Sequence, residues 1–142
     1  MGLFYFSIGL AILSSVMYHI FQRSTSTTVN PALAFIITYI VSLLLCLILL
    51  LFLPLKDGLP AELRKLNWAS FALALALVGL EIGFLLAYRS GWDLGNAALM
   101  SNVSAAILLV PLGVLLFRER PTLTNLVGVV VCIIGLILVN TR

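Results

Sequence analysis

The sequence predicts an all-α integral membrane protein with five transmembrane helices. Hydrophobic residues make up 63% of the chain and charged residues only 9%, whereas a soluble domain has about 25% charged residues. The mean hydropathy is +1.23, and five apolar segments each approach the ~20 residues that cross a bilayer as a helix. Backbone groups in lipid have no water to bond, so each segment is expected to be helical. The predicted spans, within a single domain of residues 1–142, are 3–22, 32–53, 68–88, 96–117 and 121–140.

The first two spans are bounded by clear signals. Gly2–Phe21 has no basic region before it and no small-residue cleavage site close after it, so we expect a retained helix rather than a signal peptide. The second span opens after Asn30-Pro31 and ends at Pro54. Its half Ser42–Leu53 is leucine-rich and offers nothing to a polar ligand, so this helix is predicted to lie at the periphery.

The longest connection, Pro54–Asn67, precedes the third span. Asp57-Gly58 is a turn signal. Pro60 is predicted to start a short interfacial helix whose Leu63 and Leu66 face lipid.

The fourth and fifth spans form a hairpin about Phe117-Arg118-Glu119-Arg120-Pro121. Its charges cannot cheaply enter hydrocarbon, and so short a turn requires the two helices to lie antiparallel and in contact. Asp93 begins a plausible N-cap region for the fourth span. Pro121 suits the first turn of the fifth span, because it lacks an N–H.

Glu81 is the most informative polar residue, because it lies near the middle of the third span. A charge at that depth costs roughly 2.5–3.5 kcal/mol on insertion scales, which argues against a lipid-facing position. The functional interpretation is a proton-coupling or cation-binding carboxylate. The structural alternative is a protonated acid that bonds a neighbouring helix.

Further candidate residues lie on the fourth and first spans. Ser101 and Asn102 either line a polar cavity together with Glu81 or bond between helices, an interaction worth only ~0.6 kcal/mol. On the first span, Ser15 and Tyr18 are further candidates for solute or proton binding. The lone His19, close to a span end, is expected to be an interfacial residue, and Tyr88, Trp68 and Trp92 are expected to belong to the interfacial aromatic belt.

Small residues on the fifth span predict close helix packing. Gly128, Cys132 and Gly135 are spaced by four and three residues and share one stripe. Such stripes let helices approach closely in lipid. We interpret this stripe as a helix-packing or dimerisation seam.

Several function classes receive no support from the residues. The net charge of +3 comes from basic residues that sit singly between apolar runs, which does not suggest nucleic-acid binding. No metal-ligand spacing, nucleophile elbow or phosphate-binding loop is present, so we expect no cofactor, no metal and no enzymatic activity.

The distribution of Lys and Arg predicts orientation. Five crossings place Lys56, Arg64, Lys65, Arg118 and Arg120 on one side and Arg23, Arg89 and Arg142 on the other. This bias favours a cytoplasmic N-terminus. It is also small enough to permit insertion in both orientations.

The hairpin motif resembles a known superfamily. Leu115–Thr122, followed by Gly128 and Ile134-Gly135-Leu136, is similar to the closing hairpin of the drug/metabolite transporter superfamily, and the five-span layout resembles one EamA-type domain, half of a ten-helix transporter. Ala11–Val16 and Arg23-Ser24 resemble the first helix of the small multidrug resistance proteins, whose proton-binding glutamate falls at Ser15 here.

The resemblance implies a secondary transporter in the cell (inner) membrane that moves a small organic solute by alternating access. Proton coupling through Glu81 is expected from the depth and charge of this residue alone, because the family pattern does not supply it. Transport sites of this kind lie between inverted repeats, so we expect an inverted homodimer or a pair with a homologous chain. The alternative is a non-transporting accessory or structural subunit of a larger membrane complex.

Overall fold

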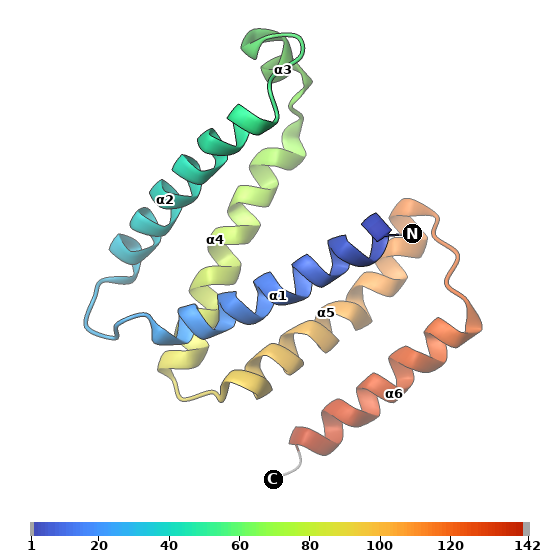
Figure 1. Cartoon of the computed structure of the whole chain (residues 1–142). Coiled ribbons are helices and arrows are strands. Elements are labelled where there is room, and N and C mark those ends of the chain that lie inside the picture. The colour runs from blue at the N-terminus through green and yellow to red at the C-terminus, as the bar shows by residue number, and fades with distance from the viewer. Residues whose placement is uncertain (1, 141–142) are drawn as a thin grey trace. The chain divides into compact units, whose positions relative to one another are not determined.

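All regular secondary structure in the described part of the chain is α-helical. The computed structural model describes residues 2–140, and the chain falls into two compact units, Met1–Arg89 and Ser90–Arg142. Six helices follow one another within the described residues (Figure 1): α1 Gly2–Ser24, α2 Pro31–Phe52, α3 Leu59–Lys65, α4 Trp68–Arg89, α5 Leu94–Phe117 and α6 Leu123–Asn140. The predicted all-α class is therefore confirmed, and the helix bounds differ from the predicted ones by a few residues at most.

Four of the described helices, α1, α2, α4 and α5, are long and apolar enough to cross a membrane. The apolar part of α6, Leu123–Val139, is shorter and extends about 25 Å at 1.5 Å per residue, compared with a hydrocarbon core of about 30 Å. The fifth span consequently stays a prediction.

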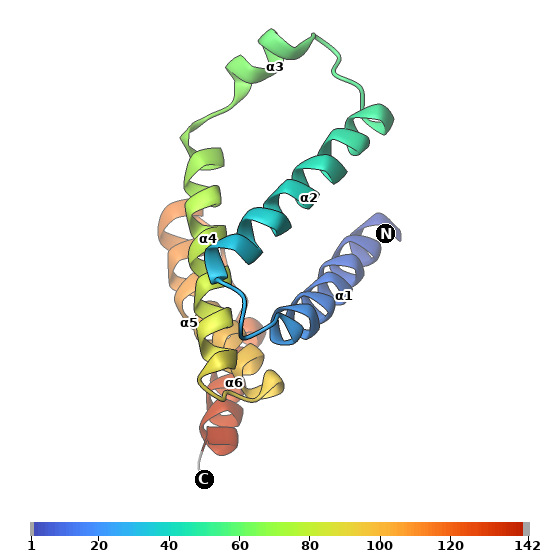
Figure 2. The ribbon, with the colours of Figure 1, turned by 90° about the vertical axis from the view of Figure 1, so that its left-hand side faces the viewer.

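In the first unit, α1 packs against α4, and α3 joins the far ends of α2 and α4 (Figure 2). Asn30 caps α2, because its Oδ1 accepts from the Ala32 N–H at 2.9 Å. Among the described residues of this unit, the buried side chains are Leu85, which is 2% exposed, with His19, Phe35, Glu81 and Tyr88. The remaining surface of α1 and α2 is apolar and exposed, as expected of helices that face lipid.

His19 and Tyr88 correct the expectation that both are interfacial residues. His19 is 6% exposed and Tyr88 is 8% exposed. The Tyr88 Oη and His19 Nδ1 lie 2.8 Å apart in a buried hydrogen bond, and both rings contact Phe84, with centroids 4.6 Å from His19 and 6.0 Å from Tyr88. Both residues lie where α1 crosses α4, so helix packing covers them. Trp68 and Trp92 remain exposed at 79% and 42%.

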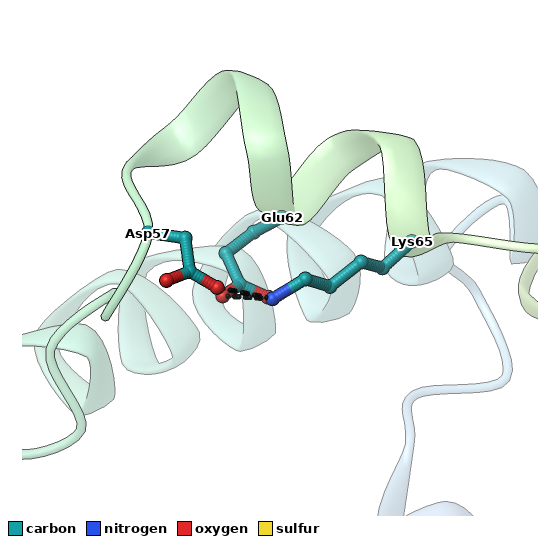
Figure 3. A network of polar contacts seen from close by, with 3 residues as sticks. All are labelled: Asp57, Glu62 and Lys65. Carbon is teal, nitrogen blue, oxygen red and sulfur yellow. Dashed lines mark hydrogen bonds and ion pairs between the residues drawn. The ribbon is translucent and has the colours of Figure 1, made fainter.

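The predicted short helix is confirmed as α3. Gly58, at φ +78°, adopts a left-handed conformation that suits glycine and precedes the first residue of the helix. Lys65 donates to Asp57 at 2.6 Å and to Glu62 at 2.9 Å (Figure 3). Leu63 and Leu66 are each 54% exposed, so both are free to face lipid.

In the second unit, α5 and α6 form the predicted antiparallel hairpin (Figure 1). Asp93 occupies the N-cap position of α5 as expected, whereas Pro121 lies before α6 rather than in its first turn. The helix starts at Leu123 because Thr122 is its cap: the Thr122 Oγ1 accepts from the Asn125 N–H at 3.3 Å. At the other end of the turn, Arg118 has φ +55° and closes α5.

Candidate functional site

Glu81 is buried in a membrane-length helix without a counter-charge. Glu81 is 9% exposed. Measured along the helix axis at 1.5 Å per residue, it lies about 12 Å from Arg89, the last residue of α4. Among residues 2–140, its carboxylate has neither an ion-pair partner nor a hydrogen bond. A buried charge without a partner is costly, so this position requires a proton or a cationic ligand.

Two tyrosines from different helices lie beside the part of α4 that carries Glu81. The Tyr18 ring of α1 packs edge-on against Phe84, with 5.9 Å between the ring centroids, and Tyr39 of α2 lines a groove together with Val78 and Ile82. Both hydroxyl oxygens are buried and lack a hydrogen-bond partner within the described part of the chain. Buried polar atoms are normally satisfied, so the two unpaired hydroxyls and the unpaired carboxylate together form a candidate binding site.

The position of Glu81 on α4 explains this convergence. The α4 residues that contact α1 include Phe84 and Tyr88, whereas Val78 and Ile82 line the α2 side. At 100° per residue, Glu81 falls between these two faces. It therefore lies at a corner of α4, between the face that contacts α1 and the face that borders the groove beside α2.

A groove of about 490 Å³ lies between the start of α2 and α4, next to this corner. Tyr39 lines it together with apolar side chains. These are Phe35, Ile36, Val78, Ile82, Leu85 and Leu86. The corner thus combines a polar end with an apolar recess.

Polar contacts fix the α1–α4 crossing around the site. Gln22 Nε2 donates to the Glu81 carbonyl oxygen at 2.8 Å, and the Arg23 guanidinium carbon lies 5.8 Å from the centroid of the Tyr88 ring. Arg89 Nη2 donates to the Ser26 and Val29 carbonyl oxygens at 3.0 and 3.1 Å. These contacts tie the loop between α1 and α2 to the end of α4.

Of the predicted candidates, the structure brings together Glu81 and Tyr18. Ser15 is exposed on α1, and Ser101 and Asn102 are exposed on α5. The cavity that was predicted to unite Asn102 with Glu81 involves residues of two separately described units and stays a prediction. Tyr39 and Gln22 were not predicted from the sequence. The sequence does show that Tyr39 carries a hydroxyl in an otherwise apolar span, but it does not relate Tyr39 to Glu81.

The small-residue stripe on α6 is open within its own unit. Gly128 and Cys132 line a groove of about 410 Å³ between α5 and α6, together with Asn102 and Asn125. A Cβ added at Gly128 or Gly135 meets no atom within 4 Å among the described residues. The stripe is therefore not used for close packing within the hairpin, and its role as a dimerisation seam stays a prediction.

Comparison with known proteins identifies a relative and a family for this chain. An uncharacterized protein of Methanocaldococcus jannaschii is 30% identical over 139 residues, which cover 94% of this chain and 96% of the relative. No solved structure matches the chain. The sequence matches the EamA-like transporter family over residues 2–141.

This match spans nearly the whole chain, including the α4 segment with Glu81 and the hairpin. The family comprises membrane transporters rather than enzymes. Membrane-length helices with exposed apolar surfaces imply direct contact with the lipid bilayer. The chain is thus a multi-pass membrane protein of transporter type, and it belongs to the EamA-like transporter family of the drug/metabolite transporter superfamily.

Proposed function

We propose that this protein is a secondary transporter that moves a small organic solute by alternating access and couples it to protons through Glu81. The observation that carries the proposal is the buried Glu81 carboxylate, which has no counter-charge and lies beside the unpaired hydroxyls of Tyr18 and Tyr39. Ionisable groups inside membrane spans are expensive and mark ion or substrate pathways. Membership of a transporter family supports the same conclusion.

The transporter is proposed to work as two copies, either a homodimer or a pair with a homologous chain. Transport sites in such folds lie between inverted repeats, and residues 1–142 hold a single repeat. With α6 as a fifth span, the odd number of crossings would invert two fused copies automatically. Separate copies must instead insert in opposite orientations to form inverted repeats. The relative, of which the alignment covers 96%, is also about one repeat long, which is consistent with pairing of separate chains.

The test is transport in proteoliposomes at matched protein incorporation, using a panel of radiolabelled amino acids, nucleobases, polyamines and quaternary amines. Wild-type protein is expected to accumulate at least one panel member under a pH gradient. Glu81→Gln preserves shape but removes the titrating proton, so it should lose gradient-driven accumulation. Tyr5→Phe, at a 68% exposed position of α1, is the matched control and should behave as wild type.

Full gradient-driven accumulation by Glu81→Gln would contradict the proposed role of Glu81. Absence of any transport by the wild type across this panel would contradict the transporter proposal for these solutes.

Asn102→Ala and Ser101→Ala in the same assay test the two predicted solute-binding residues of α5. Loss of exchange without loss of expression is the expected result for both.

A further inference from the structure

We propose that the corner formed by Glu81, Tyr18 and Tyr39 recognises a primary ammonium group, and that the groove between α2 and α4 receives the apolar part of the same molecule. The solute is then an amphipathic primary amine. This inference rests on the proposed function in that it names the solute class of the same site. The binding claim itself is measured without transport.

The charge of the site selects a cation. The Glu81 carboxylate is 9% exposed and has no counter-charge among the described residues. An anionic ligand would add repulsion to the ionised carboxylate, and a neutral ligand would leave Glu81 dependent on a proton for its neutralisation. A monocation neutralises the ionised carboxylate directly.

The hydrogen-bonding groups select a cation that carries N–H donors. The hydroxyl oxygens of Tyr18 and Tyr39 are buried without partners, and the carboxylate is a third acceptor. A primary ammonium has three donors and no acceptor, as does the lysine side chain, so its donors match these three acceptors in number. A quaternary ammonium has no N–H and would leave both tyrosines unsatisfied.

The adjoining groove selects an apolar substituent. Tyr39 lines the groove of about 490 Å³ together with Val78 and Ile82, which lie three residues before and one residue after Glu81 on α4. The other residues that face the groove along α2 and α4 are mainly aliphatic or aromatic, among them Phe35, Val78 and Ile82. A single ring or a short alkyl chain attached to the ammonium is of suitable size and polarity.

The experiment measures binding of four matched probes to the full-length, detergent-solubilised protein by isothermal titration calorimetry at pH 7. The probes are 2-phenylethylamine, its N,N,N-trimethyl analogue, 2-phenylethanol and 3-phenylpropionate, which share the apolar body and differ in the head group. The amine is expected to bind at least tenfold more tightly than each other probe. Equal binding of the trimethyl analogue or of the alcohol, or tighter binding of the carboxylate, would overturn the proposal.

Two variants test the assigned groups separately. Tyr18→Phe and Tyr39→Phe each keep the ring and remove one acceptor for a charged donor, so amine binding should weaken roughly ten- to a hundredfold. Binding of the trimethyl analogue should stay within twofold. The exposed Tyr5→Phe change is the control and should leave the preference intact. Unchanged amine affinity in both Tyr18→Phe and Tyr39→Phe would also overturn the assignment.

The two proposals fail in different ways. Binding of the amine without transport in proteoliposomes would support the ammonium site and contradict the transporter proposal. Glu81-dependent transport of an anionic or neutral solute, with no binding of the amine, would support the transporter proposal and contradict the ammonium site.

Discussion

At the scale of single residues, Tyr88 and His19 hold the crossing of α1 and α4 through their 2.8 Å hydrogen bond. Tyr88→Phe removes this bond but keeps the ring that stacks on Phe84. Hydrogen bonds between membrane helices average about 0.6 kcal/mol and reach about 1.7 kcal/mol, so we expect a loss of unfolding free energy in that range. Unfolding in mixed detergent–SDS micelles measures it. Tyr5→Phe is the matched control, and an equal effect of both changes would contradict the assigned role.

Lys65 provides a pH-dependent contact outside the spans. Its hydrogen bonds to Asp57 and, to a smaller extent, to Glu62 raise the pKa of Lys65. A raised folded-state pKa means that the stabilisation is complete below the ordinary lysine pKa and is lost as the pH rises through the folded-state value. Because the pair is solvent-exposed (Figure 3), its effect on stability is expected to be small and salt-sensitive.

An NMR titration of the Lys65 ammonium group tests which of these two contacts raises the Lys65 pKa more. Asp57→Asn should lower the Lys65 pKa more than Glu62→Gln does, because the Asp57 hydrogen bond contributes more to the upward shift. The opposite order, or no change in either variant, would contradict the geometry of the network.

The site residues differ in how far sequence alone could reveal them. Glu81 was predictable because an acidic residue inside an apolar membrane span is unusual, whichever face of the helix it occupies. Tyr39 was not, because its relation to Glu81 depends on how α2 approaches α4, which no local spacing encodes. His19 and Tyr88 were placed in the interfacial belt by their positions near span ends, and only the crossing of α1 with α4 reveals their burial.

At the scale of elements, the long helices were predictable because apolar runs in lipid have no alternative to helix. The short α3 was predictable from Asp57-Gly58 and Pro60, and the structure places Gly58 at φ +78° there. The start of α6 was misplaced by two residues because Pro121 and Thr122 are both plausible helix-start residues. The hydroxyl of Thr122 makes the capping bond and decides between them.

The α5–α6 hairpin supplies a test of the small-residue stripe. A Cβ at Gly128 meets nothing within 4 Å, so Gly128→Ala should leave the protomer stable and Gly128→Leu should mainly weaken association of copies. Gly135→Leu should act in the same way. Cross-linking or FRET between copies in lipid measures the change, and an oligomer unaffected by leucine at both positions would contradict the seam.

Gly113 on α5 is the internal comparison for these changes. A Cβ there would lie 2.5 Å from the Glu119 carboxylate oxygen, so Gly113→Ala requires that side chain to move. Gly113→Ala is therefore expected to alter the hairpin turn without weakening association of copies. A loss of association comparable to that of Gly128→Leu would show that the seam is not specific to α6.

At the scale of the whole molecule, orientation in the bilayer is the property on which a two-copy transporter depends. Arg89 bonds the loop after α1, so Arg23 and Arg89 belong to one end of the first unit, whereas Lys56, Arg64 and Lys65 flank or lie in α3 at the other (Figure 1). The excess of basic residues on the α3 side is small. C-terminal reporter fusions are therefore expected to read as a mixture of both orientations.

Charge edits should resolve that mixture. Adding a lysine near Arg23 and another near Arg89, together with Lys56→Ala and Arg64→Ala, should shift the fusions towards one orientation. A native chain with one clean orientation that these edits do not move would contradict dual insertion. It would favour pairing with a homologous chain of opposite bias.

The number of protons exchanged when solute binds tests most directly whether solute binding and proton binding meet at Glu81. Calorimetric titration of a panel compound that binds, repeated in buffers of different ionisation enthalpy, gives this number for wild type and for Glu81→Gln. We expect proton release by the wild type, of up to about one proton per solute, and none by Glu81→Gln. Equal proton release by both proteins would contradict it.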